Sequence, residues 1–201
     1  MKRNHFFPLL IAMLLSSIIT TAQSAKTYPD LLTVPGPVSF EGMSYKLAWS
    51  SHPTATYYKQ EYLPAGDALA KFTSMLMLEL VIADMTIKDI VAAKVDELKA
   101  MKASNPIVNY EMFQKDGEYI LDFLLSANEA DGKSIAVIER NVYRYKTFTD
   151  KSGKKGVLLF SVSTRAYGKA ADAFLVNLKA TKSKIVNAVA KFMIPAVVIK
   201  K

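Results

Sequence analysis

The segment from Tyr119 to Tyr167 constrains the fold most, because apolar and polar residues alternate along much of its length. A period of two is typical of strands with one buried face. Turn sequences around Asp131-Gly132 and over residues 150–153 divide the segment into three strands, of which the last two span Ile135–Thr149 and Lys154–Tyr167. Connections this short join antiparallel neighbours, so the sequence predicts an antiparallel meander at the centre of the fold.

Further strands and helices are expected on both sides of this meander. Strand patterns cover residues 38–50, 55–63 and 107–114, and the last of these turns back through the hairpin signal Lys115-Asp116-Gly117. Helical spacing of apolar residues covers residues 68–83 after the N-cap candidate Asp67, 87–103 after Thr86 with Asp89 in the first turn, and 170–193. The order ββ-αα-ββββ-α predicts an α+β fold: a single domain with an antiparallel sheet of about six strands flanked by helices.

Two details of this pattern have more than one interpretation. Met75 and Met77 widen the apolar face of the first expected helix, which fits either core packing or a pliable binding surface. In the strand 135–149 the apolar residues change parity near Glu139–Val142, which predicts a bulge or a strand that leaves the core.

The order of the elements also suggests a relationship to known domains. Glu61-Tyr62-Leu63-Pro64 runs into the helix expected after Asp67, and residues 154–167 run into the last helix. In this order the chain resembles small exported domains of the PsbP/DcrB kind, over most of its length after residue 24. The resemblance implies an antiparallel sheet flanked by helices. Members of that group have varied roles, so it implies no site residue.

The N-terminal residues have the pattern of a secretory signal peptide. Lys2 and Arg3 precede an apolar run over residues 6–19, and small residues follow. We expect cleavage after Ser24, with cleavage after Ala22 or an uncleaved anchor as alternatives. The predicted organisation is a signal peptide at 1–24, an extended or mobile proline-rich leader at 25–37 and the domain at 38–201. The run is shorter than the ~20 residues of a membrane span, so we expect export to the periplasm or the medium and no transmembrane span in the mature chain.

The sequence lacks the residues on which many catalytic and metal sites depend. There is no cysteine, which excludes disulfides, thiol catalysis and thiolate metal sites, and His52 is the one histidine after the signal peptide. No glycine-rich nucleotide motif is present. We therefore expect no cofactor, no metal and no catalysis. An enzyme of unrecognised type stays an alternative, for instance one using paired carboxylates from Glu111, Glu118, Asp122 and Glu139.

Charge is distributed unevenly along the chain. Residues 25–139 contain 10 Lys or Arg and 16 Asp or Glu, whereas residues 140–201 contain 14 and 2. Such asymmetry fits an anionic partner. The alternative is that the two parts interleave in one sheet and their charges mix on its surface.

The most basic part of the meander is the predicted functional surface. Arginine forks suit carboxylate or phosphate groups, and tyrosines add apolar faces and hydroxyl donors. The alternative is that these cations dock onto nearby carboxylates of the same chain: Glu111, Glu118, Asp122 or Glu129. The candidate binding residues are Arg140, Tyr143, Arg144, Tyr145, Lys146, Lys154, Lys155 and Arg165.

These observations favour an exported, non-catalytic binding or accessory protein of the cell envelope. Its expected partner is an anionic envelope component: lipid phosphate, an acidic glycan or an acidic protein. Nucleic acid fits the charge, but the export signal argues against it. A structural or assembly subunit, which would pair a sheet edge or the methionine-rich segment with another chain, is the second hypothesis.

Overall fold

The computed structural model describes residues 27–200, and the predicted signal peptide therefore lies outside the described residues. Eight strands and two helices form this described part of the chain. In chain order they are β1 (Val38–Phe40), β2 (Met43–Thr54), β3 (Tyr57–Pro64), β4 (Ser74–Val81), α1 (Ile87–Lys102), β5 (Asn109–Lys115), β6 (Glu118–Asn128), β7 (Ile135–Thr149), β8 (Lys155–Tyr167) and α2 (Ala170–Lys191).

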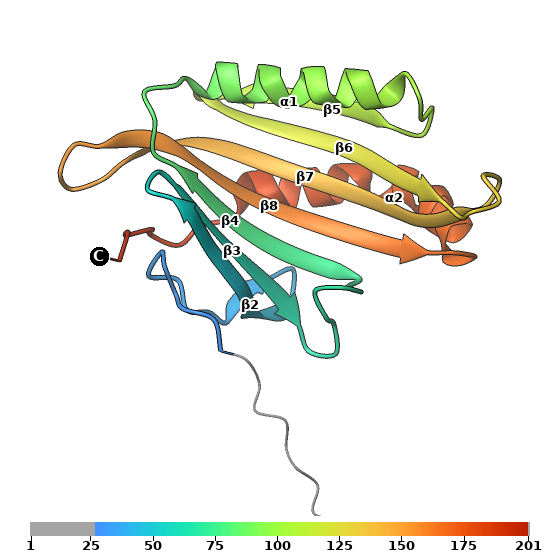
Figure 1. Cartoon of the computed structure of the whole chain (residues 1–201), viewed down its shortest axis with the longest axis horizontal. Coiled ribbons are helices and arrows are strands. Elements are labelled where there is room, and N and C mark those ends of the chain that lie inside the picture. Colours follow the sequence, from blue (N-terminus) through green and yellow to red (C-terminus); the bar gives the residue numbers. More distant parts are fainter. Residues whose placement is uncertain (1–26, 201) are drawn as a thin grey trace, which may run out of the picture.

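All eight strands belong to one antiparallel sheet, in the order β1-β2-β3-β4-β8-β7-β6-β5 (Figure 1). The predicted α+β class and the antiparallel sheet are confirmed. The expected count of about six strands and the order ββ-αα-ββββ-α are wrong. The N-terminal strands join the meander through β4, which pairs with β8 over eight residues and so lies between β3 and β8.

The helix predicted over residues 68–83 is the main error. Residues 74–81 form β4, and six of its eight residues are buried because both faces of this strand are covered. A continuous apolar run of this length fits a buried helix as well as a central strand. Met75 and Met77 are buried in β4, as the core-packing alternative predicted.

Local signals elsewhere predicted the structure correctly. Asp116 and Gly117 both have positive φ, as the tight turn between β5 and β6 requires. Thr86 caps α1, and it forms a capping box with Asp89 through hydrogen bonds of 3.2 Å in both directions. α2 begins at Ala170, as predicted.

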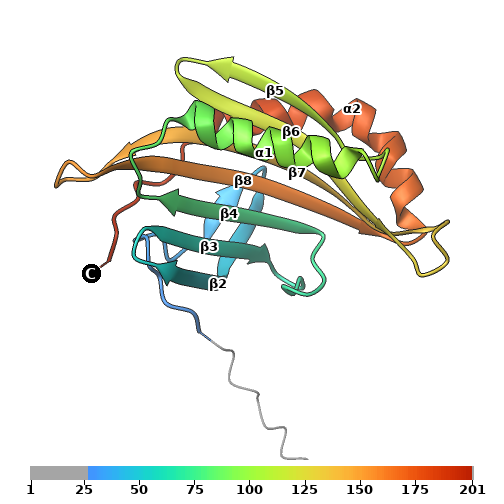
Figure 2. The ribbon, with the colours of Figure 1, turned by 45° about the horizontal axis from the view of Figure 1, so that its top comes forward.

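The two helices cover opposite faces of the sheet (Figure 2). Val91 and Leu98 of α1 pack with Leu121, Phe123 and other residues of β4 to β8 on one face. On the other face α2, the N-terminal leader and the C-terminal segment (residues 192–200) pack in a second cluster with residues of β1 to β4 and β6 to β8. None of the helices in the described chain is long and apolar enough to cross a membrane.

The leader is part of the second cluster. Leu32 and Val34 are buried, and the fully buried Gln60 side chain accepts hydrogen bonds from the Leu31 and Leu32 amides at 2.6 and 2.8 Å. Its amide nitrogen donates to the Val34 carbonyl at 3.1 Å. Backbone hydrogen bonds then join residues 31 and 32 to residues 198 and 200. Residues 31–34 therefore contribute to the core, although the chain bends over residues 31–33 and Thr33 has a positive φ of 56°.

The bulge predicted near Glu139–Val142 is wrong. β7 pairs with β8 without interruption from Val137 to Thr149. The apolar pattern breaks there because polar side chains lie on both faces of the regular strand: Arg140 is buried on the α2 side and Asn141 on the α1 side.

Candidate functional site

The predicted basic hairpin does not form one surface, because its residues alternate between the two faces of the sheet. Arg140 and Arg144 of β7 lie on the α2 face, where they contact α2. Tyr143 and Tyr145 belong to the α1-side cluster. Lys154 and Lys155 are exposed at the start of β8, whereas Arg165 lies near its end, about 33 Å away at the rise of an extended strand.

Arg140 forms a buried internal ion pair. Its Nε and Nη2 donate to the two carboxylate oxygens of Asp122 on β6, both at 2.9 Å, and Nη2 also donates to the Lys182 carbonyl at 2.9 Å. Only 4% of Arg140 is exposed. This guanidinium therefore links β6, β7 and α2.

Arg144 has a similar role at the end of α2. Its Nε donates to Glu118 Oε2 at 2.6 Å, and Nη1 donates to the carbonyls of Val189 and Phe192 at 3.1 and 2.8 Å. A cation at a helix C-terminus pairs with carbonyls that have no partner within the helix. Burial alone raises the pKa of Glu118, but the hydrogen bond and charge of Arg144 outweigh it and lower that pKa below its usual value. Lys146, exposed on the same strand, lies 3.5 Å from Glu118.

On the opposite face of the sheet, the one that carries α1, a polar cleft opens over β3, β4, β7 and β8. Its volume is about 210 Å³. β3, the connection 65–73, β4, β7 and β8 form its walls and floor. The residues that line this polar cleft are Lys59, Glu61, Leu69, Phe72, Met75, Met77, Glu139, Asn141, Tyr143, Ser163 and Arg165.

A buried polar side chain with one atom unpartnered among the described residues, that of Asn141, lies at the floor of the polar cleft. Asn141 is 1% exposed, and its Oδ1 accepts a hydrogen bond from Ser163 Oγ at 2.5 Å. Within residues 27–200, Asn141 Nδ2 has no hydrogen-bond partner, nor has Ser161 Oγ, which lies next along the same face of β8. An unpaired buried polar group costs about 1–3 kcal/mol, so such groups call for a partner such as a water molecule or a ligand.

Two ion-paired groups flank this floor. Lys59 Nζ lies 2.9 Å from Glu61 and 3.5 Å from Glu79. Burial alone lowers the pKa of Lys59, but the hydrogen bond to Glu61 and the charge of Glu79 outweigh it and raise that pKa above its ordinary value. On the other side Arg165 pairs with Glu139 and stacks on the Phe72 ring, with its guanidinium carbon 4.0 Å from the ring centroid. Each cation at the rim is thus already neutralised by a carboxylate.

Tyr143 supplies a neutral hydroxyl between these groups. Burial raises its pKa well above the ordinary value, and the nearby Glu79 carboxylate adds to the effect. The phenol therefore stays protonated at physiological pH and can donate or accept a hydrogen bond.

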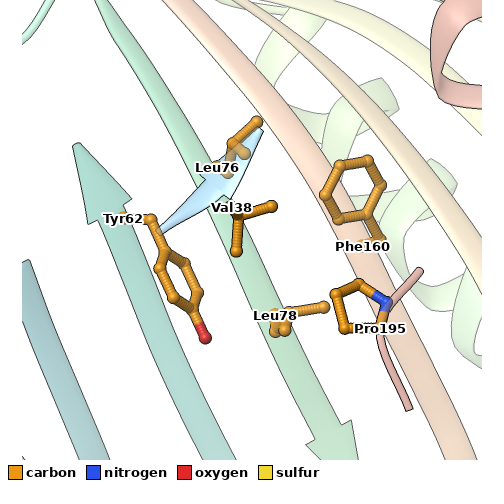
Figure 3. Close-up of a pocket in the computed structure, with 6 residues that line it drawn as sticks. All are labelled: Val38, Tyr62, Leu76, Leu78, Phe160 and Pro195. Atoms are coloured by element: carbon orange, nitrogen blue, oxygen red, sulfur yellow. The ribbon is translucent and has the colours of Figure 1, made fainter. Parts of the chain in front are cut away.

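A second cavity lies on the other face and has a different character. Figure 3 shows apolar side chains of β1, β3, β4, β8 and the C-terminal segment turned toward one another: Val38, Tyr62, Leu76, Leu78, Phe160 and Pro195. No space between them is large enough for a water molecule. This is a packing gap in the core, and the polar cleft is the better candidate site.

The described residues contain no group of three or more His, Cys, Asp or Glu that could hold a metal ion. His52 lies on β2, where its ring stacks on Tyr58 with centroids 4.0 Å apart and Nδ1 lies 2.9 Å from the Tyr57 carbonyl oxygen. This histidine lies outside the polar cleft.

Of the residues that line the polar cleft, the sequence predicted Tyr143 and Arg165 as binding residues. It offered Glu139 only as an alternative catalytic carboxylate, and Met75 and Met77 only as an alternative binding surface. It did not point to Lys59, Glu61, Asn141 or Ser163. The parity change near residues 139–142 was the available signal. Polar residues in the middle of a central strand either form internal pairs or face a cavity, and here both occur.

Comparison with known proteins gives one match. A protein-family model covers residues 32–194, which is most of the chain. The chain belongs to this family. The match includes all ten described helices and strands and ends within the C-terminal segment. It supplies no activity, ligand or partner. No curated protein and no solved structure matches the chain, so the resemblance to PsbP/DcrB domains stays a prediction.

The ion pair on the α2 face allows a test of the role of Arg140. Arg140→Met leaves the Asp122 carboxylate buried without a partner, which should lower the free energy of unfolding by about 3–5 kcal/mol. Adding Asp122→Leu should recover most of that loss, because the uncompensated charge is then gone. Urea-induced unfolding measures the free energy of unfolding of the single and the double variant.

The matched control is Lys146→Met on the same face of β7, where the side chain is 47% exposed. It should change the free energy of unfolding by less than about 0.5 kcal/mol. Equal, small effects at positions 140 and 146 would contradict the assignment of Arg140 as an internal structural residue.

Proposed function

We propose that this protein is an exported, non-catalytic binding protein whose ligand is a small, neutral, hydroxyl-rich molecule of the saccharide class, held in the polar cleft. The observation that carries the proposal is the buried Asn141 at the floor of the cleft, whose Nδ2 has no hydrogen-bond partner among the described residues. Binding sites combine a concavity with a few convergent polar groups.

The size of the polar cleft limits the ligand. About 210 Å³ is below the ~300–1,000 Å³ typical of sites for drug-sized molecules. Asn141 Nδ2 has almost no exposed surface, so a ligand that reaches it must displace side chains at the floor. A compact molecule with several hydroxyl groups fits both limits, because it can offer an acceptor to Asn141 and further donors and acceptors to the rim.

The electrostatics favour a neutral ligand. The cations Lys59 and Arg165 already pair with Glu61, Glu79 and Glu139. A zwitterion or an anion would have to compete with these internal pairs, whereas a hydroxyl can accept from a cation and donate to its carboxylate at the same time. The adjacent donors and acceptors of the rim therefore suit saccharide hydroxyls.

A titration monitored by nuclear magnetic resonance tests this proposal. With 15N-labelled protein, glucose, galactose and N-acetylglucosamine are added separately, and glycine serves as the zwitterionic comparison. At least one saccharide should shift the side-chain amide signals of Asn141 and the backbone amides of Ser161 and Ser163. Asn141→Ala should abolish these shifts, whereas Asn187→Ala on the exposed face of α2 should preserve them.

If glycine alone shifts these amide signals, the polar cleft binds a zwitterion, and the proposal of a neutral ligand is wrong. If no compound perturbs these amides at saturating concentration, the polar cleft does not bind a small polar ligand of either kind.

A second candidate function is contact with an anionic envelope component, and we propose α2 as the surface for it. In the described part of the chain, Lys169, Lys179 and Lys191 are exposed and form no ion pair, whereas the predicted arginines are paired inside. Exposed basic helix faces suit anionic lipid headgroups.

Sedimentation with lipid vesicles tests the second candidate. The protein should bind vesicles that contain phosphatidylglycerol more than purely zwitterionic ones, with release by salt. Lys179→Glu with Lys191→Glu should reduce binding severalfold, whereas Lys154→Glu with Lys155→Glu, at the far hairpin, should not. Equal losses in the two pairs would contradict a site on α2.

A further inference from the structure

β5 forms one outer edge of the sheet, and its outer side is not covered by another described element. It pairs with β6 on one side only. Figure 2 shows β5 at the upper rim, with α1 in front of the sheet and α2 behind it. No backbone hydrogen bond to another described segment satisfies its outer side. Such an edge is a template for pairing with another strand.

Apolar side chains are exposed along this edge. Met112 is 52% and Phe113 42% exposed. The register with β6 divides β5 between the two faces: Met112 lies opposite Leu121 on the α1 side, and Phe113 lies opposite Ile120 on the α2 side. Both faces of the edge strand therefore offer apolar surface that a partner strand could cover.

We propose that β5 pairs antiparallel with β5 of a second copy of this chain, around a two-fold axis at Phe113. In this register Phe113 faces its own symmetry mate. Glu111 then lies opposite Lys115 of the partner subunit, and Lys115 lies opposite Glu111 of the partner subunit. All three residues lie on the α2 side of the strand, as directly opposite residues of an antiparallel pair must.

Charge complementarity selects this register. Opposite charges that face each other across antiparallel strands are stabilising, and like charges are destabilising. A pairing shifted to centre on Met112 would place Lys115 opposite Asn109 and Glu111 opposite Phe113, with no ion pair directly across the strands. Lys115 forms no ion pair among the described residues, while Glu111 has an exposed one with Lys182. Lys115 is thus available to a partner strand.

The two-fold axis repeats the Glu111–Lys115 pair, so exchanging the two charges tests the proposed pairing. Wild-type protein should show concentration-dependent dimerisation in sedimentation-velocity centrifugation. Glu111→Lys alone or Lys115→Glu alone places like charges opposite each other twice, so each should shift the monomer–dimer equilibrium at least tenfold toward monomer. The double variant restores opposite charges in reversed order and should dimerise like wild type.

Lys133→Glu, an exposed charge reversal in the β6–β7 loop, is the matched control and should leave dimerisation unchanged. Circular dichroism confirms that each variant is folded. A wild-type protein that stays monomeric at all concentrations, or a double variant as weak as the single ones, would overturn the proposed pairing.

Discussion

The uninterrupted pairing of β7 with β8 is the constraint on which the rest of the structure depends. Thirteen residue pairs, from Val137–Tyr167 to Thr149–Lys155, keep one register. Because side chains alternate strictly along a paired strand, this register sends Arg140 and Arg144 to one face and Glu139, Asn141 and Tyr143 to the other. The same strand therefore carries internally paired arginines on one face and polar residues that line a cleft on the other.

On the α2 face the charged side chains form internal ion pairs and hydrogen bonds. Arg140 links Asp122 to the Lys182 carbonyl, and Arg144 links Glu118 to the last carbonyls of α2. A buried ion pair contributes little net stability compared with apolar packing, because desolvation offsets its attraction. Its consequence here is positional: α2 is fixed in one place over β6 and β7. On the α1 face the polar residues instead surround a cleft, where Asn141 Nδ2 has no partner in the described chain.

The sequence predicted features that depend on neighbouring residues. The turn at Asp116-Gly117, the capping box of Thr86 and Asp89, and the start of α2 all follow from local chemistry. It did not predict β4, because an apolar run covered on both faces has no period that separates strand from helix. The grouping of the basic residues failed for another reason. Parity placed Arg140 with Arg144 correctly, and the alternative in which the cations dock onto carboxylates such as Asp122 and Glu118 of β6 is the one the structure bears out. The sequence could not decide between the two, because a cross-strand register is not encoded in either strand alone.

The central claim is that the polar face of the β7–β8 hairpin forms a ligand site. A crystal structure at about 1.2 Å resolution, where amide nitrogen and oxygen can be distinguished, tests it most directly. We predict Asn141 Oδ1 bound to Ser163, and an ordered atom of a ligand or water about 3 Å from Nδ2. A closed, dry cleft in which protein groups satisfy both ends of the Asn141 amide would contradict the claim.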